Sequence, residues 1–258
     1  MKDTALLVVS FGTSYKETRE KTIEVIEREM AEAFKEADLK RAFTSGMIIK
    51  RMKQRDGILV NNVDEALKEI CDEGYKNVLI QPTHIIDGDE FEKMLGMIMP
   101  YVGNFEHIKI GRPMLTTSND YERVVNIIME EMSDLSKDEA LVLMGHGTGH
   151  YTDAAYAALD YRFKAMGYKN VFVGTVEGYP ELDDIIPMIK EYNPSKIRLL
   201  PFMIVAGDHA TNDMAGDDED SWKNVLLNEG FEVECIIKGL GEMEGIRQIY
   251  IDHLKEEI

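Results

Sequence analysis

The sequence is poor in cysteine and has no long apolar run. Its two cysteines, Cys71 and Cys235, form no CxxC pair, which argues against a disulfide framework or a zinc knuckle. No segment approaches the roughly 20 uninterrupted apolar residues that cross a bilayer. The apolar residues near the start, 5–9, are too few for a secretory signal. We therefore expect a cytoplasmic protein without a membrane partner.

Positive charge is also scarce: the 29 Lys and Arg residues are outnumbered by 48 Asp and Glu residues, which gives a formal net charge of −19. Such a surface repels nucleic acid and anionic membranes, and it concentrates cations. We expect no nucleic-acid partner. A polycarboxylate ligand would need a locally basic surface on this chain.

Several catalytic signatures are missing from the sequence. It contains no GxGxxG after the first predicted strand, no Walker A loop, no HExxH and no GxSxG. Dinucleotide, ATP, zincin and α/β-hydrolase chemistry are therefore disfavoured, and we expect no nucleotide cofactor.

What is present is a regular alternation of strand-like and helix-like segments, which predicts an α/β fold with parallel sheets. The expected strands are 5–9, one before residue 44, 78–80, 108–110, 140–144, 171–176, 197–202 and 231–237. The expected helices are 23–37, 63–70 after an Asn61 cap, 89–101, 118–133, 153–163, 181–192, 221–228 and 245–254.

The two halves of the chain look like copies of one unit. Residues 9–13 (VSFGT) align with 144–148 (MGHGT), and 81–90 align with 200–209. The repeat is too long for a solenoid and suits two similar α/β lobes. We expect lobes at residues 1–135 and 136–258, each with a parallel four-stranded sheet and related by duplication, with the metal site in the second.

Three polar residues follow three predicted strands of the second half: His146, Glu177 and His209. Ligands of open parallel sheets bind beyond the carboxyl ends of the strands, so these side chains are expected to meet. Two imidazoles and a carboxylate bind divalent first-row metals and leave coordination positions open.

Each of these residues also has a structural interpretation. Glu177 could equally cap the following helix, and His209 alone could be a surface loop residue. His146 lies between two glycines, which suits the close approach of a ligand better than a core position. In the alignment of the two halves, Phe11 occupies the position equivalent to His146, and Glu90 the position equivalent to His209. Only the second half therefore has both imidazoles.

Three further features of the first half are candidates. His84 follows a strand and either contacts a ligand or is a half-buried histidine; Glu90 either faces a ligand or caps a helix. Residues 44–55 form the densest basic segment, in which Lys50, Arg51 and Arg55 either meet ligand carboxylates or pair with acidic neighbours.

Residues 8–14, 144–148, 177–180 and 206–217 resemble the anaerobic sirohydrochlorin cobaltochelatases, the CbiK family, and the resemblance covers nearly the whole chain. It implies a chelatase-like fold of two lobes. It also implies a lyase-class enzyme that inserts Co²⁺, as substrate metal, into sirohydrochlorin or precorrin-2 without ATP, early in anaerobic cobalamin synthesis.

The resemblance assigns metal binding to His146, Glu177 and His209, with His146 and His209 as catalytic residues. Contacts with the tetrapyrrole are expected from Ser10, Phe11, Gly12, Ser45, Lys50, Arg51, His84 and Glu90. The expected partners are the tetrapyrrole and a divalent metal, and a homo-oligomer is compatible with the sequence. Iron or nickel insertion, a non-catalytic metal or tetrapyrrole carrier, and a metal-dependent hydrolase are the alternatives.

Overall fold

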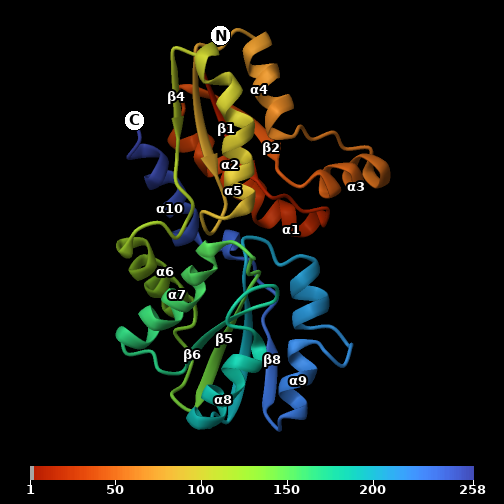
Figure 1. Ribbon diagram of the computed structural model, residues 1–258, viewed down its shortest axis with the longest axis vertical. Coiled ribbons are helices and arrows are strands. Elements are labelled where there is room, and N and C mark those ends of the chain that lie inside the picture. Colours follow the sequence, from red (N-terminus) through yellow and green to blue (C-terminus); the bar gives the residue numbers. More distant parts are fainter. Residues whose placement is uncertain (1–2) are drawn as a thin grey trace. The chain divides into compact units, whose positions relative to one another are not determined.

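Two separate parallel sheets account for the strands of residues 3–258, the part of the chain that the computed structural model describes (Figure 1). The first unit comprises the residues up to Thr116 together with Glu244–Ile258, and the second comprises Thr117–Met243. Within residues 3–258, every helix is too short or too polar to cross a membrane.

The first unit has its strands in the order β2-β1-β3-β4. Its strands are β1 (Thr4–Ser10), β2 (Ala37–Phe43), β3 (Asn77–Pro82) and β4 (His107–Ile110). Its helices are α1 (Lys16–Lys21), α2 (Ile23–Ala33), α3 (Gly46–Asp56), α4 (Val63–Asp72), α5 (Asp89–Ile98), a 3-10 turn at Met99–Asn104, and α10 (Glu244–Lys255).

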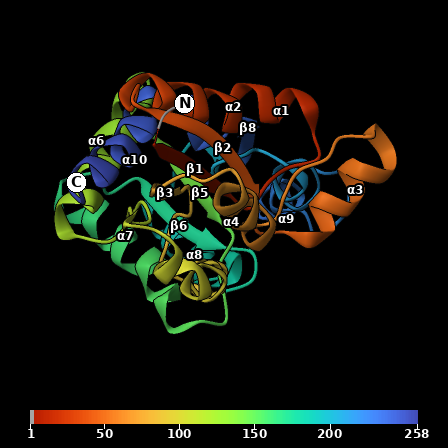
Figure 2. The same ribbon diagram turned by 90° about the horizontal axis from the view of Figure 1, so that it is seen from above.

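β1 lies at the centre of this sheet and is covered on both faces, which explains its unbroken apolar sequence. Leu7 and Val9 belong to the core formed with α4 and α5. Helices α2 and α10 contact each other and pack on the sheet through β1, β2 and β3. Figure 2 shows α2 and α10 on one side of β1 and β3, and α4 on the other.

The second unit has its strands in the order β6-β5-β7-β8. Its strands are β5 (Glu139–Gly145), β6 (Val171–Thr175), β7 (Lys196–Phe202) and β8 (Glu232–Cys235). Its helices are α6 (Ser118–Glu131), α7 (Ala154–Ala165), α8 (Leu182–Tyr192) and α9 (Trp222–Asn228), with 3-10 turns at Tyr151–Asp153 and Leu240–Glu242 and a π-helical turn at Ala210–Met214.

The two sheets share one topology and one register. Val9 of β1 lies opposite Pro82 of β3, and Met144 of β5 lies opposite Pro201 of β7. The sequence repeat aligns Val9 with Met144 and Pro82 with Pro201. The predicted α/β fold with two parallel four-stranded sheets flanked by helices is confirmed.

The structure divides the chain differently from the expected lobes 1–135 and 136–258. Helix α6 belongs to the second unit, where it contacts α7, and α10 belongs to the first, where it contacts β3 and α2. His253 of α10 is fully buried, and its Nδ1 lies 3.2 Å from the Arg112 carbonyl oxygen. The apolar face of the last helix therefore completes the first core.

Two local predictions were wrong. Ala37, expected at the end of a helix, begins β2, because the helix ends at Ala33 and a turn intervenes. The cap of α4 is Asn62 rather than Asn61. The Asn62 side chain accepts from the Glu65 N–H, and the Glu65 carboxylate accepts from the Asn62 N–H. The Asn61 side chain instead donates to Glu69.

Candidate metal centre

The candidate metal ligands come from the carboxyl ends of three adjacent strands of the second unit. His146 directly follows β5, Glu177 lies two residues beyond β6, and His209 lies in the segment after β7. The chain passes from β5 outward to β6 and then returns past β5 to β7. The two histidines therefore flank the point where the strand order reverses, which is the usual ligand site of such sheets.

The structure brings these three side chains together. One ligand atom from each of His146, Glu177 and His209 lies within 4.8 Å of the others. The two imidazole rings are 4.7 Å apart between centroids and nearly perpendicular, and His146 Nδ1 lies 3.9 Å from a Glu177 carboxylate oxygen. Among the described residues this is the one set of three such side chains at this spacing.

Glycines allow the His146 loop to lie against the Glu177 loop. Gly147 has a φ of +79°, which L side chains rarely adopt. A Cβ on Gly147 would lie 2.4 Å from the Gly178 nitrogen, and a Cβ on Gly145 would lie 2.4 Å from the Tyr156 ring. The glycines that flank His146 are therefore required by the close approach of backbone and an aromatic ring.

Hydrogen bonds join the same two loops. The Glu177 N–H donates to the His146 carbonyl at 2.8 Å. The Asp153 carboxylate accepts from the Thr148 N–H at 3.0 Å and from the Tyr179 N–H at 2.6 Å. Asp153 thus holds the loop after β5 against the loop after β6, and with it the relative positions of two candidate ligands.

A carboxylate also holds the second imidazole. His209 Nδ1 lies 2.5 Å from a carboxylate oxygen of Asp213, four residues later, where the chain forms the π-helical turn. His146 Nδ1 lies 2.9 Å from the Gly147 carbonyl oxygen. With Nδ1–H donating in both cases, each ring presents its Nε2 lone pair, as in histidines that bind metals.

The three side chains remain accessible to ligands. Their exposed fractions are 44% for His146, 60% for Glu177 and 32% for His209. Glu177 does not cap the next helix, because that role belongs to Glu181. Two neutral imidazoles and one carboxylate suit a divalent ion such as Co²⁺ and leave coordination positions for an incoming ligand.

The ring-binding candidates all lie in the first unit, and three of them have structural roles there. Ser10 is buried, and its hydroxyl accepts from Thr83. Ser45 caps α3 by accepting from the Ile48 N–H. Gly12, with a φ of +100°, lies where a Cβ would be 2.5 Å from the Phe43 ring. Phe11, by contrast, is exposed.

The imidazole of His84 is buried in the first unit, whereas the Glu90 side chain is partly exposed and pairs with Lys93. His84 is partly exposed as a residue, but both of its ring nitrogens are buried and lack a hydrogen-bond partner, as does one carboxylate oxygen of Glu90. Burial lowers the pKa of His84 to about 4, against an opposing effect of the Glu90 charge. His84 is therefore neutral at pH 7.

Lys50 and Arg51 are exposed on α3, and within residues 3–258 neither forms an ion pair. Pairing with acidic neighbours, the alternative considered from the sequence, is therefore absent for these two cations.

Two carboxylates that contact the candidate site, Asp213 and Asp153, were not predicted from the sequence. Asp213 stands four residues after His209, a spacing that places two side chains on one helical face, so the sequence held a signal for it. Asp153 lies 26 residues from Tyr179, whose N–H it binds. Only the folded chain reveals that contact.

Comparison with known proteins gives the family. The sequence profile described as Cobalt chelatase (CbiK) matches residues 4–258. A Salmonella typhimurium relative described as sirohydrochlorin cobaltochelatase is 43% identical over 254 residues, which are 98% of this chain and 96% of the relative. A Nitratidesulfovibrio vulgaris relative described as sirohydrochlorin cobaltochelatase CbiKC is 32% identical, covering 98% of this chain and 90% of the relative.

A solved structure supports the same fold. SirB from Bacillus subtilis with Fe³⁺ matches with a TM-score of 0.68 at 12% identity, covering 100% of this chain and 96% of that chain. At this identity the likeness shows the fold alone. Because the family profile and the Salmonella relative both span nearly the whole sequence, the chain belongs to the CbiK family of cobalt chelatases.

Proposed function

We propose that this chain is a sirohydrochlorin cobaltochelatase, which inserts Co²⁺ into the metal-free ring without a nucleotide cofactor. The observation that carries the proposal is the cluster of His146, Glu177 and His209 in a chain of the CbiK family. The reaction belongs to the anaerobic route to cobalamin, as the resemblance to this family implies.

The chemistry requires an exchange of protons for a metal ion. The ring loses two pyrrole N–H protons, its four nitrogens bind Co²⁺, and the metal gives up its protein ligands and waters. A site for this reaction must hold the divalent ion in an open coordination sphere, and it must take up protons close to the ring. Two imidazoles and one carboxylate meet both needs.

The surroundings of each side chain support distinct roles. Glu177, the most exposed of the three, supplies negative charge to the divalent ion. His146 is fixed by its neighbouring carbonyl and presents Nε2 as a ligand. His209 is backed by Asp213 at 2.5 Å, so a proton on Nε2 produces a cation that already faces a carboxylate. We assign the uptake of a ring proton to His209.

The test is anaerobic metallation of sirohydrochlorin by Co²⁺, followed by absorbance, with catalytic amounts of the chain. We expect protein-dependent formation of cobalt-sirohydrochlorin over many turnovers. His146→Ala and His209→Ala are expected to lose most of this activity, whereas His107→Ala, an exposed histidine on β4 of the first unit, serves as the matched control.

Other outcomes would replace the proposal. A spectral change that saturates at one ring per chain without turnover would indicate a carrier. Faster insertion of Fe²⁺ or Ni²⁺ than of Co²⁺, measured side by side, would indicate a different metal substrate, which ligand type alone does not determine.

A further inference from the structure

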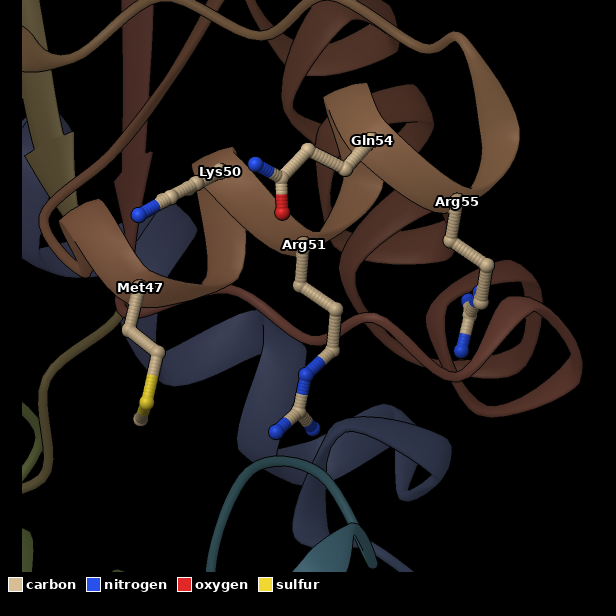
Figure 3. Close-up of a pocket in the computed structure, with 5 residues that line it drawn as sticks. All are labelled: Met47, Lys50, Arg51, Gln54 and Arg55. Carbon is tan, nitrogen blue, oxygen red and sulfur yellow. The ribbon is translucent and has the colours of Figure 1, made fainter.

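Helix α3 carries an exposed basic face. Met47, Lys50, Arg51 and Gln54 recur at the spacing i, i+3, i+4 and i+7, with Arg55 beside them, so they share one side of the helix. Figure 3 shows Met47, Arg51 and Arg55 extending to the same side of α3.

A surface helix normally packs an apolar stripe on the core and turns a polar face outward. In α3 Met52 is the buried residue, and the face that carries Met47 and the cations is turned outward. Met47 is 65% exposed, an unusual position for a large apolar side chain beside two cations. In both views of the fold, α3 projects from the sheet of its unit (Figures 1 and 2).

Two of the three cations on this face, Lys50 and Arg51, have no carboxylate partner among the described residues, in a chain that is strongly acidic. The net charge is −19, and most other cations near the sheet have carboxylate partners, such as Lys40 with Glu69 and Glu73. Arg55 binds Asp56. Among the described residues, Lys50 and Arg51 have no such partner. Their charges are therefore available to a ligand.

This face of α3 also lines a cavity that a ligand can enter. Met47, Lys50, Arg51, Gln54 and Arg55 line an open cavity of about 340 Å³. A guanidinium and an ammonium fit carboxylate groups, and the exposed thioether of Met47 fits an apolar ring edge. The polycarboxylate tetrapyrrole has this combination of groups, because its carboxylate side chains surround an apolar ring.

We propose that this face of α3 (the α3 basic face: Met47, Lys50, Arg51, Gln54 and Arg55) binds carboxylate side chains of the tetrapyrrole. The proposal rests on the proposed function, because it takes the ring as the ligand. A nucleic-acid ligand is disfavoured, because two unpaired cations in a chain of charge −19 give little counterion release.

The test is anaerobic titration of the full chain with metal-free sirohydrochlorin in the absence of cobalt, with the dissociation constant read from absorbance. The variant is Lys50→Gln with Arg51→Gln, both on exposed positions. The matched control is Lys35→Gln with Lys53→Gln, which removes the same charge from two exposed lysines outside the hollow. A second variant, Lys50→Arg with Arg51→Lys, keeps the charges.

We expect the Lys50/Arg51 variant to bind the ring about tenfold more weakly, because two charge-assisted contacts are lost. The control and the charge-retaining variant should stay within about twofold of the native chain. The difference should shrink as salt rises from about 20 to about 200 mM, because salt screens exposed charges. Co²⁺ affinity without the ring should not change, since the candidate metal ligands lie in the other unit.

The outcomes separate the two proposals. A native chain that metallates the ring while the Lys50/Arg51 variant binds it as tightly as the control would overturn the α3 assignment alone. A native chain that neither binds nor metallates the ring would overturn the proposed function, and the α3 assignment with it.

Discussion

Asp213 is the residue whose role in the site is best defined by a single contact. Its carboxylate lies 2.5 Å from His209 Nδ1, and this contact sets both the ring orientation and the nitrogen that is free to bind metal. Partners of this kind commonly contribute 10- to 100-fold to metal affinity.

We predict that Asp213→Ala weakens Co²⁺ binding by about 10- to 100-fold, because the His209 ring is then free to rotate. Asp213→Asn keeps an acceptor but loses the charge, so its effect should be intermediate. Calorimetric titration with Co²⁺ measures both. Asp220→Asn, an exposed carboxylate of the same unit, is the control. Unchanged affinity in Asp213→Ala would refute the assigned role.

His84 leads to a prediction about stability rather than metal binding. Its buried ring stays neutral because its pKa is lowered to about 4 by burial, whereas in the unfolded chain it takes up a proton below about pH 6.5. Below pH 6.5 the unfolded state therefore binds more protons than the folded state. The free energy of unfolding must fall as the pH drops towards 4.

We predict that this residue alone costs about 2 kcal/mol of unfolding free energy between pH 7 and pH 5. His84→Gln, which has no titrating ring, should show that much less pH dependence in urea unfolding. His107→Gln, at an exposed position, should leave the pH dependence of the native chain unchanged. Equal pH dependence in all three proteins would mean that His84 is not held neutral.

At the scale of elements, two loops that are hydrogen-bonded to each other carry two of the candidate ligands. The loop after β5 carries His146, and the loop after β6 carries Glu177. The Asp153 carboxylate accepts an N–H from each, and a Cβ on Gly178 would lie 2.2 Å from it. Since the loops carry two of the three candidate ligands, Asp153 acts as a positioning residue.

We predict that Asp153→Ala lowers the unfolding free energy by about 1–3 kcal/mol, because two N–H groups lose their acceptor. It should also weaken Co²⁺ binding by about tenfold. The control is Asp184→Ala, which removes another carboxylate that accepts a backbone N–H, the Glu181 N–H, in the same unit. It should lose stability without losing Co²⁺ affinity. If Asp153→Ala behaves like this control, Asp153 has only a structural role.

The sequence predicted that the three candidate ligands lie together, because that prediction needed only the strand ends. Parallel strands bring their carboxyl ends to one edge, so residues 146, 177 and 209 had to be neighbours once the strands were known. It could not place Asp153, because a contact between two loops depends on their exact backbone path. The Asn61 cap failed for a similar reason: either asparagine suits a cap, and the fold selects Asn62.

At the scale of the whole molecule, the repeat predicted two similar sheets but not the course of the chain ends. An equal division at residue 135 follows if each copy keeps its own helices. Instead α10 returns to the first unit, and α6 joins the second. Tertiary packing decides this, because α10 is amphipathic and its sequence does not indicate which core it will cover.

Tyr250 shows how α10 is attached to the first unit. It is fully buried in α10, burial raises its pKa, and its hydroxyl donates to the carbonyls of Thr83 at 3.0 Å and His84 at 3.3 Å. The last helix is therefore fixed to the carboxyl end of β3. Removing the Tyr250 side chain should leave a cavity in the first unit, while the second unit has its own core.

We predict that Tyr250→Ala lowers the unfolding free energy by about 3–5 kcal/mol through the cavity that it leaves. Tyr250→Phe, which loses only the hydroxyl bonds, should cost about 1 kcal/mol. Hydrogen exchange locates the effect: amides of β1 and β3 should exchange faster in the alanine variant, while those of β5 and β7 keep their protection. Equal acceleration in both sheets would mean that the two units unfold together and that the returning helix stabilises the whole chain. Acceleration confined to β1 and β3 would establish that α10 closes the first core alone, and Co²⁺ affinity at the second unit should then be unaffected in the same variant.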